Sequence, residues 1–186
     1  MAMSHEREQG VAGFRAALLQ AADGAIAAVA AAVSILALVV LFLALGAEVV
    51  VRYLTTQGLG WPSELPNLLF PWLVMGGVVL AAQKGAHISV TLLLDLLPRG
   101  AARMLLLAMQ VVVGATFFYL AYIGLAVIEI TGSEIYPVTG ISARWAYLSL
   151  IAGFLGVGLT AVTTFLRLLT AEDPRSVRAH VSEEEI

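Results

Sequence analysis

Four long stretches of the sequence contain no charged residue, and they constrain the fold more than any other feature. They cover residues 24–47, 65–83, 104–128 and 145–166 and are 24, 19, 25 and 22 residues long. A helix needs about 20 apolar residues to cross the roughly 30 Å of hydrocarbon in a bilayer. Lipid cannot satisfy open backbone groups, and the period-two alternation of barrel strands is absent. The runs therefore predict an all-α integral membrane protein with four transmembrane helices.

The composition supports lipid as the solvent of this chain. Sixty per cent of the residues are apolar and 12% are charged, whereas soluble domains are nearer half apolar and about a quarter charged. The lack of cysteine removes disulfide frameworks, thiolate metal sites and thiol chemistry. The formal net charge is −3 and there is no basic block, so we expect membrane lipids, and no nucleic acid, among the partners.

The basic residues outside the runs set the expected orientation, because cytoplasmic loops are enriched in Lys and Arg. Eight of them lie before the first run, between the second and third, or after the fourth, against Arg52 and Arg144 in the other two loops. We therefore expect cytoplasmic tails at 1–23 and 171–186, with the first and third loops outside. The first run is too long and too far inside the chain for a cleaved signal peptide, so we expect a retained helix.

The first outside loop carries polar and aromatic residues suited to a membrane surface. Glu48 and Arg52 are spaced i, i+4, so they share a helix face and can pair. Such a pair is either a weak interfacial ion pair or part of a protein–protein contact. Tyr53 and Trp61 fit an aromatic belt at the headgroup level, and Glu64 falls at the positive end of the second helix.

The loop between the second and third runs is not simply polar. On a helix, Lys84, His87, Thr91 and Asp95 form one stripe, while most of the remaining surface at 87–97 is apolar. Because this segment is too short to span, it predicts an amphipathic helix lying in the cytoplasmic interface. His87 has no second histidine or carboxylate cluster at metal-ligand spacing, which favours a surface or capping role over a metal ligand.

Small residues recur at every fourth position in two of the runs, a spacing that lets membrane helices approach closely. They are Gly24, Ala28 and Ala32 in the first run and Ala152, Gly156 and Thr160 in the last. We expect these stripes to face neighbouring helices of this chain or of a partner.

The runs lack the residues that membrane transport or catalysis would need. Ionisable residues inside a membrane mark ion and substrate paths, and none lies within the four runs. A proton-coupled small multidrug exporter needs a carboxylate deep in a span, and Glu48 and Glu129 lie only at span ends. A haem bundle needs histidines inside its helices, but His5, His87 and His180 lie outside the runs. We therefore expect no enzyme and no cofactor.

Four motifs follow one another along the first half of the chain. They are Val-Val-Val-Arg52-Tyr53, Gly60-Trp61-x-x-Glu64-Leu65, Phe70-x-Trp72-x-x-x-Gly76 and His87-Ile88-x-Val90-x-Leu92. In this order and spacing they resemble the small membrane subunit, the Q-type subunit, of tripartite ATP-independent periplasmic (TRAP) transporters. The four spans, the expected orientation and the length agree with this family.

The resemblance implies a function that the residues alone do not state. It implies a non-catalytic small subunit of a sodium-coupled, binding-protein-dependent secondary transporter for a small organic acid or similar solute. The partners would be a large multi-span transport subunit, for which this chain is a scaffold, and a periplasmic substrate-binding protein. The location would be a bacterial inner membrane, with a multi-pass chain and both termini cytoplasmic.

The candidate functional residues are partner contacts at the ends of the spans, since we expect no catalytic, cofactor-binding or metal-ligating residue. Arg52, Trp61 and Glu64 are expected to face a partner outside. Lys84, His87 and Asp95 are expected to brace the cytoplasmic side. The full candidate set is Glu48, Arg52, Tyr53, Trp61, Glu64, Trp72, Lys84, His87 and Asp95.

Two other functions remain open from the sequence. A self-sufficient homo-oligomeric carrier or channel would need polar residues that converge on a water-filled path, and few are present. A membrane-bound enzyme or electron-transfer subunit would need a bound cofactor.

Overall fold

The computed structural model describes residues 2–55, 57–84 and 97–170, and within these ranges the chain is helical between its loops. The helices are α1 (Ala2–Thr55), the short 3-10 helix η1 (Trp61–Ser63), α2 (Leu65–Lys84), α4 (Arg99–Thr131) and α5 (Arg144–Thr170). All four long helices are long and apolar enough to cross a membrane. The prediction of an all-α protein with four helices of transmembrane length is confirmed. The expected interfacial helix at 87–97 lies, apart from Leu97, outside the described residues.

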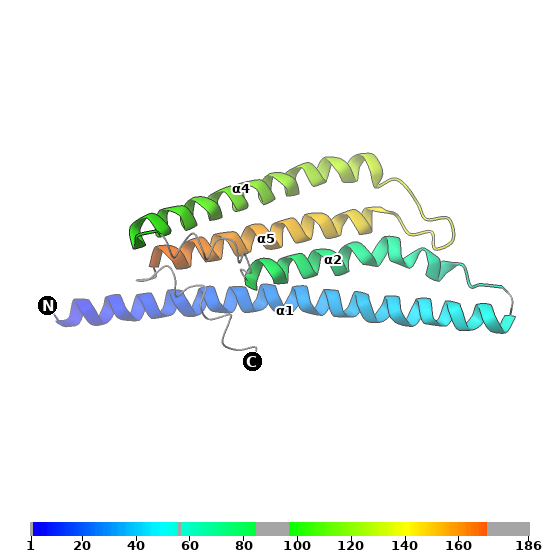
Figure 1. Ribbon diagram of the computed structural model, residues 1–186, viewed down its shortest axis with the longest axis horizontal. Coiled ribbons are helices and arrows are strands. Elements are labelled where there is room, and N and C mark those ends of the chain that lie inside the picture. Colours follow the sequence, from blue (N-terminus) through cyan, green and yellow to red (C-terminus); the bar gives the residue numbers. More distant parts are fainter. Residues whose placement is uncertain (1, 56, 85–96, 171–186) are drawn as a thin grey trace.

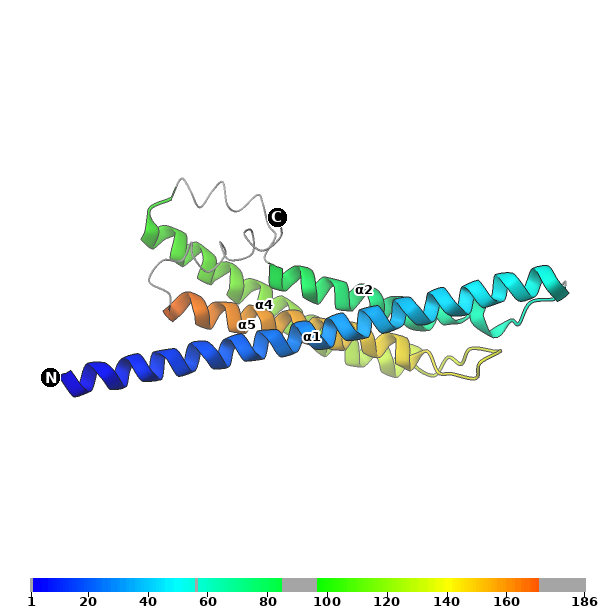
Figure 2. The ribbon, with the colours of Figure 1, turned by 90° about the horizontal axis from the view of Figure 1, so that it is seen from below.

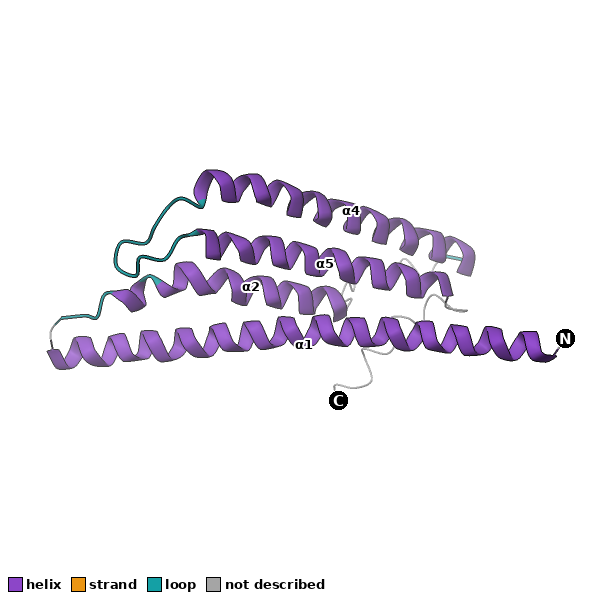
Figure 3. Cartoon of the chain, turned by 180° about the vertical axis from the view of Figure 1, so that it is seen from behind, coloured by secondary structure: helices purple, strands orange, loops and turns teal. Residues whose placement is uncertain are grey.

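The four long helices lie side by side in the order α4, α5, α2, α1 (Figure 1). Each packs on its neighbour in this row, and α1 also contacts α5. Figure 2 looks toward the row from the α1 side, and Figure 3 shows the same order from behind. The α1–α2 and α4–α5 connections lie at one end, called here the hairpin end, and the N-terminus lies toward the opposite end.

Helix α1 is much longer than its uncharged run. Its 54 residues correspond to about 80 Å at 1.5 Å per residue, whereas a bilayer with its headgroups is roughly 40–45 Å thick. Residues 2–23, expected as a tail, belong to the same helix and continue it beyond the uncharged run. A helix satisfies its own backbone in water as well as in lipid, so its ends do not have to coincide with those of the apolar run.

One narrow stripe of α1 packs against the other helices. Its buried residues are spaced alternately four and three apart, as in a coiled-coil seam, and they are Ala30, Ser34, Ala37, Leu41 and Ala44. Between residues 24 and 47 most of the remaining surface is apolar and exposed, as at Phe42, where 75% of the residue is accessible. Most of this part of α1 is thus free to contact lipid or another protein.

The small-residue stripe of the first span does not face a helix of this chain, so contact with a partner is the part of the expectation that stays a prediction. Nothing lies within 4 Å of a Cβ built at Gly24, and Ala28 and Ala32 are exposed. The packed stripe begins at Ala30, two positions away. The sequence could not distinguish these faces, because alanine is common on both sides of α1.

Glycines allow α2 to lie close to both of its neighbours. A Cβ at Gly76 would meet the Ser34 hydroxyl and lie 2.8 Å from the carbonyl oxygen of Ala30 in α1. On the other side of α2, a Cβ at Gly156 of α5 would lie 2.8 Å from Val79. The expectation that Gly156 faces a neighbouring helix is confirmed. The helix backbones approach each other only because these positions lack side chains.

Gly76 and Gly77 provide a matched test of this close approach. We expect Gly76→Ala to destabilise the chain by about 1–3 kcal/mol, the usual cost of overpacking. Gly77→Ala should leave stability unchanged or raise it, because nothing lies within 4 Å of a Cβ there and alanine favours helix. Thermal unfolding in detergent, followed by tryptophan fluorescence, measures both. Equal melting temperatures for the two variants would contradict the packing account.

Candidate functional site

Glu64 joins the two connections at the hairpin end. It directly precedes α2, and its carboxylate accepts hydrogen bonds from Val138 N–H at 2.9 Å, Thr139 N–H at 2.8 Å and the Thr139 hydroxyl at 2.8 Å. The two donor residues belong to the α4–α5 hairpin, defined here as residues 132–143. One carboxylate thus fixes the start of α2 to a segment more than seventy residues away in the sequence.

The α4–α5 hairpin has its own hydrogen bonds. Its two sides meet in an isolated β-bridge between Ile135 and Ser142. Tyr136 N–H donates to the Ile141 carbonyl at 3.0 Å, and Gly140 N–H donates to the Tyr136 carbonyl at 2.9 Å. Gly140 has a φ of +69°, a backbone conformation that glycine adopts without strain. The hairpin is therefore an ordered element on which other groups can be positioned.

Glu48 holds the other connection and does not pair with Arg52. Its Oε2 accepts a hydrogen bond from the backbone N–H of Leu59 at 2.8 Å, and a side chain at Gly58 would overlap its carboxylate. Both Glu48 and Arg52 are described, and no ion pair joins them. An unpaired loop N–H near the membrane needs an acceptor, and Glu48 supplies it.

The aromatic candidates differ in how far they are exposed. Tyr53 is 86% exposed and Trp61 is 42% exposed, as expected for side chains at a membrane surface or a partner contact. Trp72 is only partly exposed, and its indole N–H donates to the Trp145 carbonyl of α5 at 3.0 Å. Arg52, Tyr53 and Trp61 are thus the accessible candidates at this end.

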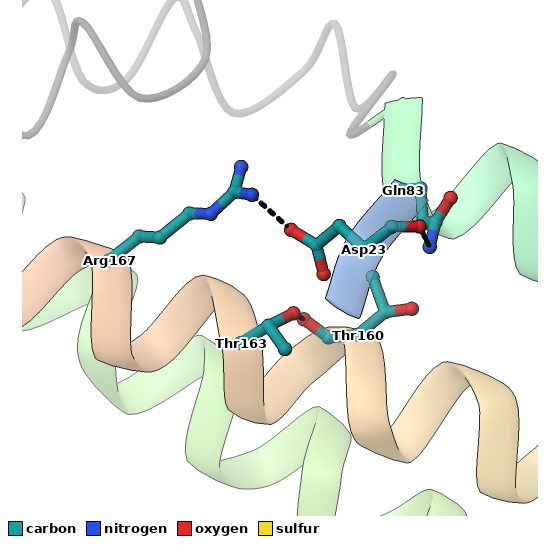
Figure 4. Close-up of polar contacts among 5 residues, drawn as sticks. All are labelled: Asp23, Gln83, Thr160, Thr163 and Arg167. Atoms are coloured by element: carbon teal, nitrogen blue, oxygen red, sulfur yellow. Dashed lines mark hydrogen bonds and ion pairs between the residues drawn. The ribbon is translucent and has the colours of Figure 1, made fainter. Parts of the chain in front are cut away.

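At the end of the row opposite the hairpin end, polar contacts that were not predicted from the sequence join three helices. The Asp23 carboxylate of α1 pairs with the Arg167 guanidinium of α5 at 2.6 Å. The Gln83 side-chain amide of α2 donates to the Asp23 backbone carbonyl at 3.1 Å. Figure 4 shows this cluster, which links three helices. Asp23 and Arg167 each bound an uncharged run at the same predicted membrane side, which was the available signal for their pairing.

Arg103 of α4 completes the polar contacts at this end. Its guanidinium donates to the Leu168 carbonyl, from Nε at 3.1 Å and Nη2 at 2.8 Å, and to the Leu169 carbonyl at 2.6 Å. These carbonyls belong to the last turn of α5, where helix carbonyls lack partners and attract positive charge.

The cytoplasmic candidates are only partly described. Lys84 is the last residue of α2 and is exposed, whereas His87 and Asp95 lie outside the described residues. Among the residues that are described, no group of three or more His, Asp or Glu side chains could hold a metal ion. The arrangement at both ends holds helices and loops in place.

Replacing Glu64 should loosen the hairpin. We expect Glu64→Gln to speed amide hydrogen exchange at Val138 and Thr139 severalfold, because a neutral amide is a weaker acceptor than a carboxylate and has only one acceptor oxygen. Hydrogen-exchange mass spectrometry on hairpin peptides measures this. Glu129→Gln, an exposed residue near the end of α4, is the control and should leave exchange unchanged. Unchanged exchange in Glu64→Gln would contradict the assigned contacts.

The Asp23–Arg167 pair should show coupling in a double-mutant cycle. Asp23→Asn and Arg167→Gln should each lower the melting temperature in detergent, because each removes the ion pair between α1 and α5. The double variant should lose less than the sum of the two single losses. Additive losses would show that the pair does not join α1 to α5.

Comparison with known proteins agrees with this architecture. The family described as "Tripartite ATP-independent periplasmic transporters, DctQ component" matches residues 41–171. A putative TRAP transporter small permease protein of Haemophilus influenzae is 28% identical over 63% of this chain and 72% of its own length. The ectoine TRAP transporter small permease protein TeaB of Halomonas elongata is 29% identical over 75% of this chain and 74% of its own length.

A further relative is a longer protein. The uncharacterized protein y4mM of Sinorhizobium fredii is 36% identical over 66% of this chain, but the match covers 23% of that protein's length. The family resemblance of the motifs is confirmed, because the family match covers well over half of the chain. The chain belongs to the family of TRAP transporter DctQ components, the small permease subunits.

Proposed function

We propose that this chain is a non-catalytic small membrane subunit that acts as a scaffold for the large subunit of a sodium-coupled, binding-protein-dependent secondary transporter. The observation that carries the scaffold role is the combination of family membership with a row of helices in which the contacts of charged side chains, among the described residues, lie at its two ends. A scaffold needs fixed helices and exposed faces, and the chain has both.

The buried polar groups of the spans support this role over that of a carrier. A transport path needs polar groups that can exchange their partners for solute or water. In the part of the chain that the structure describes, each buried hydroxyl donates to a backbone carbonyl: Ser34 to Leu73, Ser149 to Ala146, Thr160 to Gly156 and Thr163 to Thr160. Such hydroxyls satisfy themselves within or between helices, so they offer no path for a solute.

Longer relatives support a large permease as the partner. The match to the sialic acid TRAP transporter permease protein SiaT of Haemophilus influenzae covers 56% of this chain but 17% of that protein, and the match to y4mM is similarly partial. A region like this chain therefore occurs inside much longer polypeptides. In the proposed transporter, this chain and the large permease would be separate polypeptides, held together by non-covalent contacts.

An apolar groove offers a place for a helix of the large subunit. It has a volume of about 410 Å³ and lies between α1, α2 and α5. Its apolar surface comes from residues such as Val29, Leu155 and Leu159. The small side chains of Ala25 and Ala152 leave space along its sides. Small residues let helix backbones approach closely in lipid, so a transmembrane helix of the large subunit fits this groove better than a soluble protein does.

In this proposal, other chains of the transporter bind the solute and couple its transport to sodium. The named relatives include proteins of ectoine and sialic acid transporters, which supports a small organic acid or similar solute. Sodium coupling follows from the family resemblance and would reside in the large subunit. The exposed Arg52, Tyr53 and Trp61 at the hairpin end are our candidates for contact with the binding protein on the outside.

Co-purification tests the scaffold function and its groove. We expect a tagged chain to retain the large subunit in mild detergent, and Ala152→Phe to reduce the amount retained severalfold by filling the groove. Ala115→Phe is the control, because Ala115 is an exposed alanine in the middle of α4 and does not line the groove. Both changes add an apolar ring, so neither impairs membrane insertion.

The outcomes distinguish the alternatives. A wild-type chain that leaves the large subunit behind would contradict the scaffold function. If Ala152→Phe and Ala115→Phe retained equal amounts of the large subunit, the groove would not be its binding site, while the scaffold function would stand. Solute transport by the purified chain in liposomes, with no other subunit present, would support the homo-oligomeric carrier or channel instead.

A further inference from the structure

A second hollow lies at the hairpin end, separate from the groove. Its volume is about 450 Å³, and it lies between the first turns of α2, the α4–α5 hairpin and the first turns of α5. The lining residues that bear on its chemistry are Asn67, Phe70, Glu134, Tyr136, Tyr147 and Leu150. None of their side chains bonds to the Glu64 carboxylate, whose donors are Val138 and Thr139, and the proposed scaffold role does not use them.

The hollow is polar toward the hairpin and apolar toward the middle of the spans. Glu134 and Tyr136 belong to the hairpin, beyond the ends of α4 and α5. Phe70 and Leu150 lie several residues inside their helices, which is roughly 8–9 Å deeper at 1.5 Å per residue. Phe70 is also 56% exposed. A molecule with a polar head and an apolar tail, aligned with the surrounding lipid, matches this gradient.

The polar part of the hollow favours a cation. Glu134 is an exposed carboxylate, and among the described residues no Lys, Arg or His forms an ion pair with it. Burial, and then the negative charge of Glu134, raise the pKa of Tyr136, and the phenol of a tyrosine is neutral at neutral pH even without such a shift. The faces of tyrosine and phenylalanine rings attract ammonium groups, and most strongly where water is excluded.

We propose that this hollow binds the ammonium headgroup of a zwitterionic phospholipid from the leaflet at the hairpin end. Glu134 is the counter-ion, and the rings of Tyr136 and Tyr147 surround the ammonium group. The Asn67 amide lies where it can donate to the lipid phosphate, and Phe70 and Leu150 contact the start of an acyl chain. The bound lipid would fasten the hairpin to the starts of α2 and α5.

Retention of lipids by the full chain tests this site, with the large subunit present where it co-purifies. Detergent-purified protein is incubated with equal amounts of phosphatidylethanolamine, phosphatidylcholine and phosphatidylglycerol of the same acyl chains, and native mass spectrometry counts the lipids retained. We expect both ammonium lipids to be retained severalfold more than phosphatidylglycerol. Glu134→Gln should abolish that preference, while Glu129→Gln should keep it.

Two further measurements separate a headgroup site from other causes. Tyr147→Phe should keep the preference and Tyr147→Leu should weaken it, because only the first retains an aromatic face. Free ethanolamine should compete far more weakly than the intact lipid, since it lacks the acyl chain. Equal retention of phosphatidylglycerol, an unchanged preference in Glu134→Gln, or equally strong competition by free ethanolamine would overturn the proposal.

Discussion

The close approach of helix backbones in lipid is the constraint on which this structure depends. Lipid tails are as apolar as leucine, so exclusion from water does not drive membrane helices together. Packing must come from surfaces that fit closely, and α2 fits both neighbours where side chains are missing. Gly76 brings it against α1, and Gly156 of α5 admits Val79. The row of helices follows, because α2 has a close partner on each side.

Polar contacts then fix the ends of the row, where water and headgroups begin. At the hairpin end Glu64 connects α2 to the hairpin, and at the opposite end Asp23 pairs with Arg167. A charged side chain costs less free energy at the ends of the spans than in the hydrocarbon core, because water and headgroups solvate it. Where packing already holds the helices together, the two charged partners also stay close to each other. The absence of charge from the spans and the charge clusters at both ends are therefore two parts of one arrangement.

Features that depend on the length and spacing of neighbouring residues could be predicted from the sequence. Contacts between segments far apart in the chain could not. Uncharged runs predicted the spans, because their length alone matches the bilayer. The i, i+4 spacing suggested a Glu48–Arg52 pair, but the Leu59 amide needed an acceptor and Glu48 provides it. Asp23 and Arg167 are 144 positions apart, so only the packing of α1 beside α5 reveals their pairing. Trp72, a candidate for partner contact, also bonds to the carbonyl of Trp145, 73 positions away, a contact that no local pattern predicted.

The exposed apolar surface gives the remaining argument about function. In a soluble protein such a surface marks a binding site, but in a membrane lipid covers it at little cost, so exposure alone does not identify a partner. Shape and local chemistry are more informative. The groove beside α1 has low walls of small residues, which suits a helix, whereas the hollow beside Glu134 has rings and a carboxylate, which suits an ammonium headgroup. The two proposals thus concern different surfaces of the chain, one along its spans for a protein helix and one at the hairpin end for a lipid.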